Sequence, residues 1–253
     1  MARVIAIATQ KGGVGKTTTA LNLASILAEQ HRVLAVDCDA QANLTDGFGI
    51  NPDALERSLA DVLEGTCDVA DIVCAPNQSY PNLLLLPANL DLAALDTRLS
   101  GSVGRELRLR RALAPLVDAL DFVVIDCAPA LGILTLNALA ASTEVIVPVD
   151  VGVWSLKGIN KLLLTIAEVR TINSDIGSVR AVLNRVDHTN LSADVRGEVE
   201  RAFGDDLYRT AIRRSVRVGE AQAANMPVAL YRPNEPVVDD YRNLAAEVVG
   251  NGQ

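Results

Sequence analysis

Short apolar segments alternate with amphipathic segments along the whole chain. The apolar segments are rich in Val, Ile and Leu and are shorter than most buried helices, so they predict β-strands. The predicted strands are Arg3–Thr9, Arg32–Asp39, Asn82–Leu86, Asp121–Cys127, Glu144–Val149, Ser178–Asn184 and Asp206–Thr210. The predicted helices are Thr17–Glu29, Leu55–Glu64, Leu90–Leu99, Arg105–Ala119, Ile133–Ala141, Leu156–Ile172, Ser192–Phe203, Arg217–Ala224 and Val237–Val248. This alternation indicates an α/β fold: a doubly wound, mostly parallel sheet flanked by helices on both faces.

A glycine-rich segment joins the first predicted strand to the first predicted helix. Its glycines let the backbone curl so that successive N–H groups hold an anion, and the following helix dipole favours the same charge. Lys16 is expected to reach the β- and γ-phosphates of a nucleotide, and the Thr17 hydroxyl to ligate Mg²⁺. The predicted nucleotide-binding residues of this loop are Gly12, Gly13, Val14, Gly15, Lys16, Thr17 and Thr18. The segment indicates a P-loop NTPase fold.

The loop departs from the general pattern G-x-x-x-x-G-K-[ST] at its start. The first glycine of that pattern would stand at Gln10, and the chain instead has a second lysine, Lys11, one position later. A lysine at the mouth of its own loop cannot easily fold back onto a nucleotide that Lys16 already covers. Lys11 is therefore expected to point outward, towards the nucleotide of another molecule.

Acidic residues follow two of the buried strands. Asp126 ends an apolar run, as expected for an acid that holds the Mg²⁺ shell through water. Asp37 and Asp39 are separated by one residue and so point to opposite sides of an extended chain. We expect Asp39 to orient the attacking water and Asp37 to reach the metal's water shell or the hydroxyls of the loop. The alternative for all three is a helix-capping or turn aspartate.

Asn184 ends the sixth predicted strand and is the residue assigned here to adenine recognition. An amide side chain can read a base edge, and a turn-capping asparagine is the alternative.

The carboxyl ends of parallel strands meet at one edge of the sheet. The loop, Asp37–Asp39 and Asp126 are therefore predicted to form one site.

Composition limits the other function classes. The 253 residues suit a single domain, 1–253, with a core of small aliphatic residues, because the chain has only three Phe, four Tyr and one Trp. A net charge of −8 argues against a surface that binds nucleic acid everywhere, but leaves room for a local basic patch. No apolar run is long enough to span a bilayer and no signal peptide is recognisable, so a cytoplasmic location is expected. The four cysteines form no C-x-x-C pattern and are expected to be reduced.

Five segments together resemble the ParA/Soj-type partition ATPases, the deviant Walker A branch that also contains MinD. They are Lys11–Thr18, Asp37–Asn43, Gly104–Leu109, Asp121–Asn137 and Arg214–Ala221. The resemblance implies that Lys11 crosses the interface of an ATP-sandwich homodimer and touches the phosphates of the partner subunit. It also implies that Lys16 and Thr17 are the ordinary loop lysine and Mg²⁺ ligand. Asp39 then positions the attacking water, and Asp126 is the Walker B acid.

Four arginines stand between Leu207 and Val218 without an acid among them. They are Arg209, Arg213, Arg214 and Arg217. Such a cluster gives salt-dependent, sequence-independent attraction to DNA phosphates, and the resemblance places Arg217 at a position implicated in non-specific DNA binding. A second arginine of relatives falls near His188, and Arg213 is the residue expected to compensate for it. A solvated basic face is the alternative.

A second basic cluster lies on the helix predicted to begin at Arg105. Its members are Arg105, Arg108, Arg110 and Arg111, with leucines between them at helical spacing. This pattern is typical of an ordinary amphipathic helix surface. An extended DNA surface or a partner contact is the alternative.

The resemblance implies a function with ATP and Mg²⁺ as cofactors. An ATP-bound homodimer would hold DNA non-specifically on the nucleoid, and a ParB-like partner would stimulate hydrolysis, so that a plasmid or chromosome is segregated. The alternative is the nucleoid-based positioning of another cargo. With no preceding helix-turn-helix domain, specific operator binding is not expected.

Two other classes are less consistent with the sequence. A MinD-like membrane ATPase needs a basic amphipathic helix near its C-terminus, and the segment after Tyr241 has almost no positive charge. Metabolic enzymes of the same fold are the other class. One of dethiobiotin synthetase type would not need Lys11, and a relative of the nitrogenase iron protein would need cluster-ligating cysteines.

Overall fold

The computed structural model describes residues 2–76, 79–151, 156–187 and 189–250. Within them, seven strands form one sheet in the order β3-β2-β4-β1-β5-β6-β7, and every pair of neighbouring strands is parallel. The strands are β1 (Arg3–Ile7), β2 (Val33–Cys38), β3 (Leu83–Leu86), β4 (Phe122–Cys127), β5 (Glu144–Asp150), β6 (Ser178–Val186) and β7 (Leu207–Arg213). The predicted α/β fold is confirmed.

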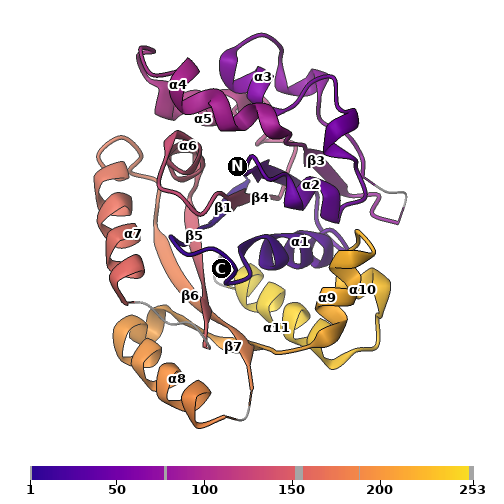
Figure 1. Cartoon of the computed structure of the whole chain (residues 1–253), viewed down its shortest axis with the longest axis vertical. Coiled ribbons are helices and arrows are strands. Elements are labelled where there is room, and N and C mark those ends of the chain that lie inside the picture. The colour runs from indigo at the N-terminus through magenta and orange to yellow at the C-terminus, as the bar shows by residue number, and fades with distance from the viewer. Residues whose placement is uncertain (1, 77–78, 152–155, 188, 251–253) are drawn as a thin grey trace.

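The helices surround this sheet (Figure 1). They are α1 (Lys16–Leu27), α2 (Asn43–Gly47), α3 (Leu59–Glu64), α4 (Leu95–Arg98), α5 (Arg108–Leu113), α6 (Ile133–Ala141), α7 (Leu156–Val169), α8 (Asn190–Phe203), α9 (Val216–Ala223), α10 (Val228–Tyr231) and α11 (Pro236–Gly250). Short 3₁₀ helices cover Pro52–Ala54, Val69–Asp71, Leu90–Ala94, Arg105–Leu107 and Gly204–Asp206. Among the described residues, no helix is long and apolar enough to cross a bilayer.

Several predicted boundaries are wrong. The helix expected at Leu55–Glu64 begins only after the Ser58 cap, whose hydroxyl accepts the N–H of Ala60. The helices expected at Leu90–Leu99 and Arg105–Ala119 each begin as a 3₁₀ turn before a short α-helix. The last two strands extend further than predicted, to Val186 and Arg213. Helices α2 and α10 were not predicted, because each is too short to show an amphipathic period.

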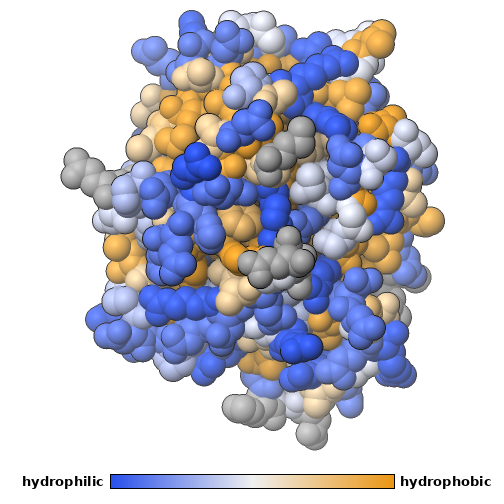
Figure 2. Space-filling model, turned by 180° about the vertical axis from the view of Figure 1, so that it is seen from behind, coloured by the Kyte–Doolittle hydropathy of each residue, from blue (hydrophilic) through white to orange (hydrophobic). Residues whose placement is uncertain are grey.

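Side-chain alternation along each strand divides the core into two layers. In β1, Val4 and Ala6 pack on the face covered by α3 to α8, whereas Ile5 and Ile7 pack on the face covered by α1, α10 and α11. Both faces are therefore apolar, which explains why the strands read as continuous hydrophobic runs. The back of the molecule shows hydrophilic residues interspersed with hydrophobic ones (Figure 2).

The strand order reverses at β1, which lies between β4 and β5. The chain leaves β1 towards β2 on one side of the sheet and reaches β5 on the other. In an open parallel sheet such a switch point leaves a crevice beyond the carboxyl ends of the strands, where ligands bind. The glycine-rich loop begins at this point.

Candidate nucleotide site

The loop after β1 has a backbone that only glycine adopts readily at two positions. Gly13 has a φ of 75° and Gly15, which caps α1, has a φ of 92°. A Cβ at Gly15 would also lie 2.8 Å from Nδ2 of Asn184. The Asn184 side chain is therefore packed against the loop too closely for any side chain at Gly15.

Asn184, on β6, braces this loop from the side. Its Nδ2 donates to the carbonyl oxygen of Val14 and to the Thr19 hydroxyl, each at 3.1 Å. Its Oδ1 is buried and has no hydrogen-bond partner among the described residues. A buried acceptor without a partner can accept a hydrogen bond from a ligand. The Nδ2 group cannot turn towards the ligand without losing its hydrogen bonds to Val14 and Thr19.

Lys16 is buried at the first position of α1. Its ammonium donates to the carbonyl oxygen of Lys11 at 3.2 Å, across the mouth of the loop. Burial lowers the pKa of Lys16, while Asp126 and Asp39 act in the opposite direction. This hydrogen bond holds the loop backbone at Lys11 against Lys16, the lysine predicted to bind the phosphates.

Asp37 and Asp126 lie side by side, because β2 and β4 are parallel and these two residues are register partners. The Asp37 carboxylate is fully buried and accepts the N–H and the hydroxyl of Thr45, at 2.8 and 2.7 Å. It also accepts the N–H of Asp39 at 3.2 Å. The structure thus shows the Asp37 carboxylate bound by Thr45 of α2, and the expectation that it reaches the metal's water shell or the hydroxyls of the loop stays a prediction.

Asp126 differs from Asp37 in lacking such partners. Both of its carboxylate oxygens are buried, and neither makes a hydrogen bond of good geometry with any described residue. Burial raises the pKa of Asp126 well above its usual range, Asp37 adds to the rise, and Thr17 and Lys16 oppose it. A buried carboxyl group in this state lacks a cation or a donor.

The donor set fits Mg²⁺ bound together with phosphates. The described residues contain no cluster of three or more His, Cys, Asp or Glu side chains that could hold a metal alone. Mg²⁺ usually keeps several waters and takes one or two protein oxygens plus phosphate oxygens. Thr17 and Asp126 are the residues that would supply or orient such ligands here.

A cavity of about 540 Å³ lies in front of the loop. It is lined by residues predicted from the sequence, namely Gly12, Gly13, Gly15, Lys16, Thr17, Thr18 and Asp39. Asp39 is half-buried there, and one of its oxygens accepts the N–H of Gln41 at 3.0 Å. The structure therefore brings Asp39, rather than Asp37, to the wall of this cavity. Its volume is in the range typical of ligand sites.

A second cavity of about 360 Å³ lies behind the loop, between Gly15, Asn184 and the β7–α9 connection. Gly15, Thr18 and Asn184 form one wall, and Val216, Val218 and Gly219 contribute to the other. Thr18 and Gln222 line both cavities, and the Gln222 amide donates a hydrogen bond to the Thr18 hydroxyl at 2.8 Å. The lining of this second cavity combines the Asn184 amide with the apolar side chains of Val216 and Val218, as small-molecule sites typically do.

Sequence reasoning missed several residues of the first cavity. Asn43, Asp46, Pro129, Arg185 and Gln222 also line it. Gln222 arrives from the C-terminal part of the chain, so no local pattern could reveal it. Asn43 and Pro129 lay within the segments Asp37–Asn43 and Asp121–Asn137 that carried the family resemblance, and this was the signal that could have found them.

The arginines near the end of β7 are less free than their local sequence suggests. The fold brings acids from other segments: Arg213 is paired with Asp240 at 2.6 Å, and Arg217 with Glu220 at 2.8 Å and Glu235 at 3.3 Å. Arg214 is the exception, with an exposed side chain and a distance of 3.9 Å to Asp187. Arg209 is exposed as well, with its backbone N–H bonded to Glu247. His188 lies outside the described residues.

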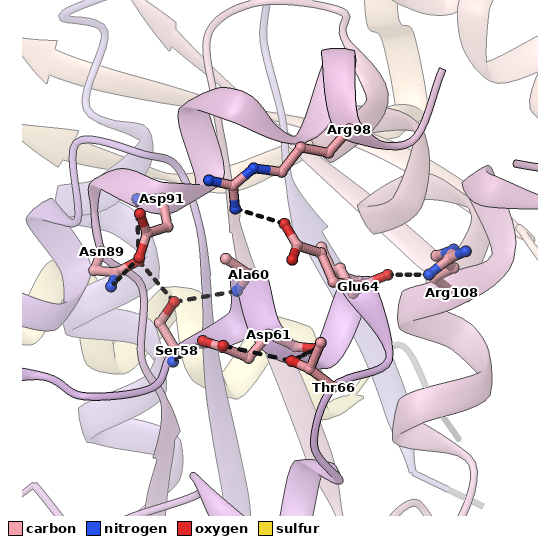
Figure 3. A network of polar contacts seen from close by, with 10 residues as sticks. Ser58, Ala60, Asp61, Glu64, Thr66, Asn89, Asp91, Arg98 and Arg108 are labelled. Carbon is pink, nitrogen blue, oxygen red and sulfur yellow. Dashed lines mark hydrogen bonds and ion pairs between the residues drawn. The ribbon is translucent and has the colours of Figure 1, made fainter. Parts of the chain in front are cut away.

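The second arginine cluster ties neighbouring elements together. Arg108 donates to the carbonyl oxygen of Leu63 at 2.6 Å, at the end of α3 (Figure 3). Arg110 bonds Asn173 and Asp175, at 3.0 and 2.7 Å, beyond the end of α7. Arg105 donates to Ser100 at 3.3 Å. These contacts favour a structural role for the cluster over a DNA surface.

Comparisons with known proteins agree with this geometry. A family described as "AAA domain" matches residues 2–177. The sporulation initiation inhibitor protein Soj of Bacillus subtilis is 42% identical over 255 residues, covering 100% of both chains. The chromosome partitioning protein ParA of Caulobacter vibrioides is 40% identical and covers 98% of this chain and 94% of its own. The chain belongs to the ParA/Soj family of ATPases.

Solved structures share the fold of this ParA/Soj-type chain. A Mycobacterium smegmatis protein described as cobyrinic acid a,c-diamide synthase, with bound ADP and magnesium, is 35% identical with a TM-score of 0.83. The match covers 98% of this chain and 94% of that one. A McdA variant from Cyanothece, in complex with ATP, has a TM-score of 0.85 at 24% identity, which shows the common fold.

The burial of Asp37 predicts a pH-dependent stability in the nucleotide-free protein. Burial raises the pKa of Asp37 from 3.8 to about 6. The folded state then binds a proton that the unfolded chain has already lost, so the free energy of unfolding falls as pH rises through this range. About one pKa unit of the shift lies above pH 5, which corresponds to about 1.4 kcal/mol. The Asp37→Asn variant removes the titrating group.

The difference in unfolding free energy between Asp37→Asn and the wild type should therefore increase from about pH 5 to about pH 7.5, in favour of the variant. Urea denaturation at several pH values measures it. Asp53→Asn, at an exposed site, is the matched control and should give a constant difference. A constant difference for Asp37→Asn as well would contradict the raised pKa.

Proposed function

We propose that the chain is a partition-type ATPase that binds ATP and Mg²⁺ between the glycine-rich loop and Asp39. The observation that carries this is the buried Asp126 carboxylate beside Lys16 and Thr17, whose two oxygens make no hydrogen bond of good geometry with the described residues. The phosphates occupy the cavity of about 540 Å³. Thr17 and Asp126 would hold Mg²⁺ there, and the ion would supply positive charge to offset the negative charge of the phosphates.

The base occupies the cavity of about 360 Å³ behind the loop. There the free Oδ1 of Asn184 accepts the exocyclic amino group of adenine, while its Nδ2 remains on Val14. Guanine carries a carbonyl oxygen at the corresponding ring position. This oxygen and Oδ1 of Asn184 are both acceptors, so they could not form a hydrogen bond. The arrangement supports a preference for ATP over GTP.

Hydrolysis depends on Asp39, which lines the phosphate cavity and orients the attacking water. Lys11, at the mouth of the loop, reaches the phosphates of a second subunit, so that the dimer closes on two ATP molecules. Charge spread over the γ-phosphate oxygens in the transition state favours an additional cation. A ParB-like partner stimulates this step.

The ATP-bound dimer holds DNA without sequence preference, through the β7–α9 arginines, and acts on the nucleoid. Arg214 and Arg209 carry the exposed charges, and Arg213 and Arg217 are paired with acids in the single chain. The pairs of Arg217 with Glu220 and Glu235 are partly exposed, so DNA phosphates compete with them at small cost. Arg213 is held more firmly, because its partner Asp240 is buried and accepts three of its hydrogen bonds. The cargo is a plasmid or chromosome, as for the proteins named Soj and ParA, or another nucleoid-borne cargo.

The other classes have less support. In α11 the apolar side chains, among them Tyr241 and Leu244, pack in the core, so this helix is not available to a membrane surface. The Mycobacterium protein is described as a diamide synthase, and a synthase that releases nitrogen from an amide through a cysteine nucleophile would need an activated thiolate. All four cysteines instead have pKa values raised above the usual range, first of all by burial.

Lys11→Ala should bind ATP but fail to dimerise on it, because Lys16 still holds the phosphates and the cation supplied to the partner is gone. Size-exclusion chromatography with ATP and Mg²⁺ measures the association, and fluorescent-nucleotide titration measures the binding. Lys161→Ala, on the exposed side of α7, is the matched control. A Lys11→Ala protein that dimerises like the wild type would rule out the lysine in trans.

Asp39→Ala should form the dimer and retain ATP with turnover reduced by about 100-fold or more, since only the water-positioning group is lost. Phosphate release and dimer lifetime are the two measurements. Asp53→Ala, another exposed acid, should leave both unchanged. Rapid turnover by Asp39→Ala would assign the water to another group.

Arg214→Ala should weaken DNA binding equally for unrelated sequences and lower the slope of log K against log salt by about one. Arg217→Ala should act in the same direction with a smaller effect, because this arginine must first leave Glu220 and Glu235. Arg196→Ala, on α8 and paired with Glu200, is the control. Equal losses at Arg196 and Arg214 would move the DNA surface elsewhere.

A further inference from the structure

Arg185, which no part of the proposed cycle uses, has an unusual backbone. It follows Asn184 near the end of β6 and has a φ of 55°, in the left-handed region. A residue with a Cβ adopts this region at a cost of about 1 to 2 kcal/mol. Such a conformation persists where the surroundings hold it, and it is frequent at functional sites.

The side chain of Arg185 explains what holds it. Its Nη1 donates to Oδ2 of Asp150 at 2.8 Å, and its Nη2 donates to the carbonyl oxygen of Gly13 in the glycine-rich loop. Asp150 ends β5, and its side chain is only 4% exposed, whereas that of Arg185 is 51% exposed. The buried carboxylate anchors the guanidinium, and the guanidinium reaches the loop.

Consecutive residues of β6 thus hold consecutive carbonyl groups of the loop. Asn184 binds the carbonyl of Val14, and Arg185 binds the carbonyl of Gly13. Successive side chains of a regular strand point to opposite faces and could not both reach one loop. The left-handed backbone at Arg185 breaks this alternation, so both side chains reach the same segment.

Holding a carbonyl also orients the amide that follows it. The peptide unit is planar and trans, so the carbonyl of Gly13 and the N–H of Val14 point in opposite directions. The bond from Arg185 therefore fixes the direction of the Val14 N–H, one of the N–H groups that a phosphate loop offers to an anion. Arg185 also lines the phosphate cavity.

We propose that Arg185, anchored by Asp150, is a positioning residue that presets the phosphate loop and so determines the affinity for nucleotide without taking part in hydrolysis. The inference rests on the proposed ATP site. The hydrogen bond from Arg185 to Gly13 is already present in the nucleotide-free protein. The loop therefore loses less conformational freedom when a nucleotide binds. Arg185 acts through the loop backbone, and ATP and ADP benefit alike.

Arg185→Met should weaken the binding of both ATP and ADP by about tenfold, with kcat within about twofold of the wild type at saturating ATP. Fluorescent-nucleotide titration and steady-state hydrolysis measure the two quantities. Arg185→Lys should recover only part of the affinity, because one ammonium cannot bond Asp150 and Gly13 in the same forked geometry. Arg201→Met, whose arginine bonds a carbonyl within α8, is the matched control.

The variant also leaves the buried Asp150 without this arginine, and that change alone can lower stability. The double variant Arg185→Met/Asp150→Asn removes the charge as well. It should unfold at a temperature closer to that of the wild type than Arg185→Met does, and yet keep the tenfold loss of affinity. Recovery of affinity along with stability would show a merely structural role and overturn the proposal.

The remaining outcomes are equally decisive. Loss of ATP binding with unchanged ADP binding would assign Arg185 a direct contact with the γ-phosphate and overturn the positioning role. Unchanged affinity for both nucleotides would overturn it as well. If the wild-type protein binds neither nucleotide, the proposed function fails, and this result is distinct from failure at Arg185.

Discussion

The pairing of β2 with β4 places two carboxylates next to each other at full burial, and much of the site follows from this. Asp37 and Asp126 are register partners on parallel strands, and both are removed from water. Thr45 satisfies Asp37, but no described residue satisfies Asp126. In the ligand-free chain, burial and the neighbouring acid favour the protonated forms of both groups, and a divalent cation beside them would favour the charged forms. A ligand that binds this site in the folded chain therefore raises the free energy of unfolding.

The glycine-rich loop is held by elements that are remote in the sequence. Lys16 grips the loop at Lys11, Asn184 at Val14, and Arg185 at Gly13. Each of these contacts uses a backbone carbonyl of the loop, which leaves the N–H groups for an anion. The rigidity of the loop thus comes from β6 and α1 together, and the glycines supply only the freedom to adopt its shape.

The sequence was sufficient for the sheet and for most of the phosphate site, because both depend on local patterns. Buried parallel strands read as apolar runs, and Lys16, Thr17, Asp39 and Asp126 stand at fixed places after them. What could not be predicted depends on contacts between distant segments. Thr45 of α2 donates a hydrogen bond to the Asp37 carboxylate. The left-handed backbone conformation of Arg185 could not be predicted from the residue type, because arginine does not favour it.

The same limit applies to the arginines near β7. Counting charges between Leu207 and Val218 gave a basic segment, because the acids that neutralise it come from α9, α11 and the loop before α11. Charge in sequence and charge in space coincide only where no other element packs nearby, and β7 is an edge strand covered by α11.

Helix α9 joins the two halves of the proposed cycle. Arg217 stands in its first turn, on the side of the arginines, and Gln222 stands near its end, bonded to Thr18 of the phosphate loop helix. The helix is eight residues long, and the two contacts lie about one and a half turns apart. In the free chain Glu220 and Glu235 neutralise Arg217 at one end of this helix, and Gln222 bonds Thr18 at the other, so α9 connects the arginine segment with the phosphate-loop helix.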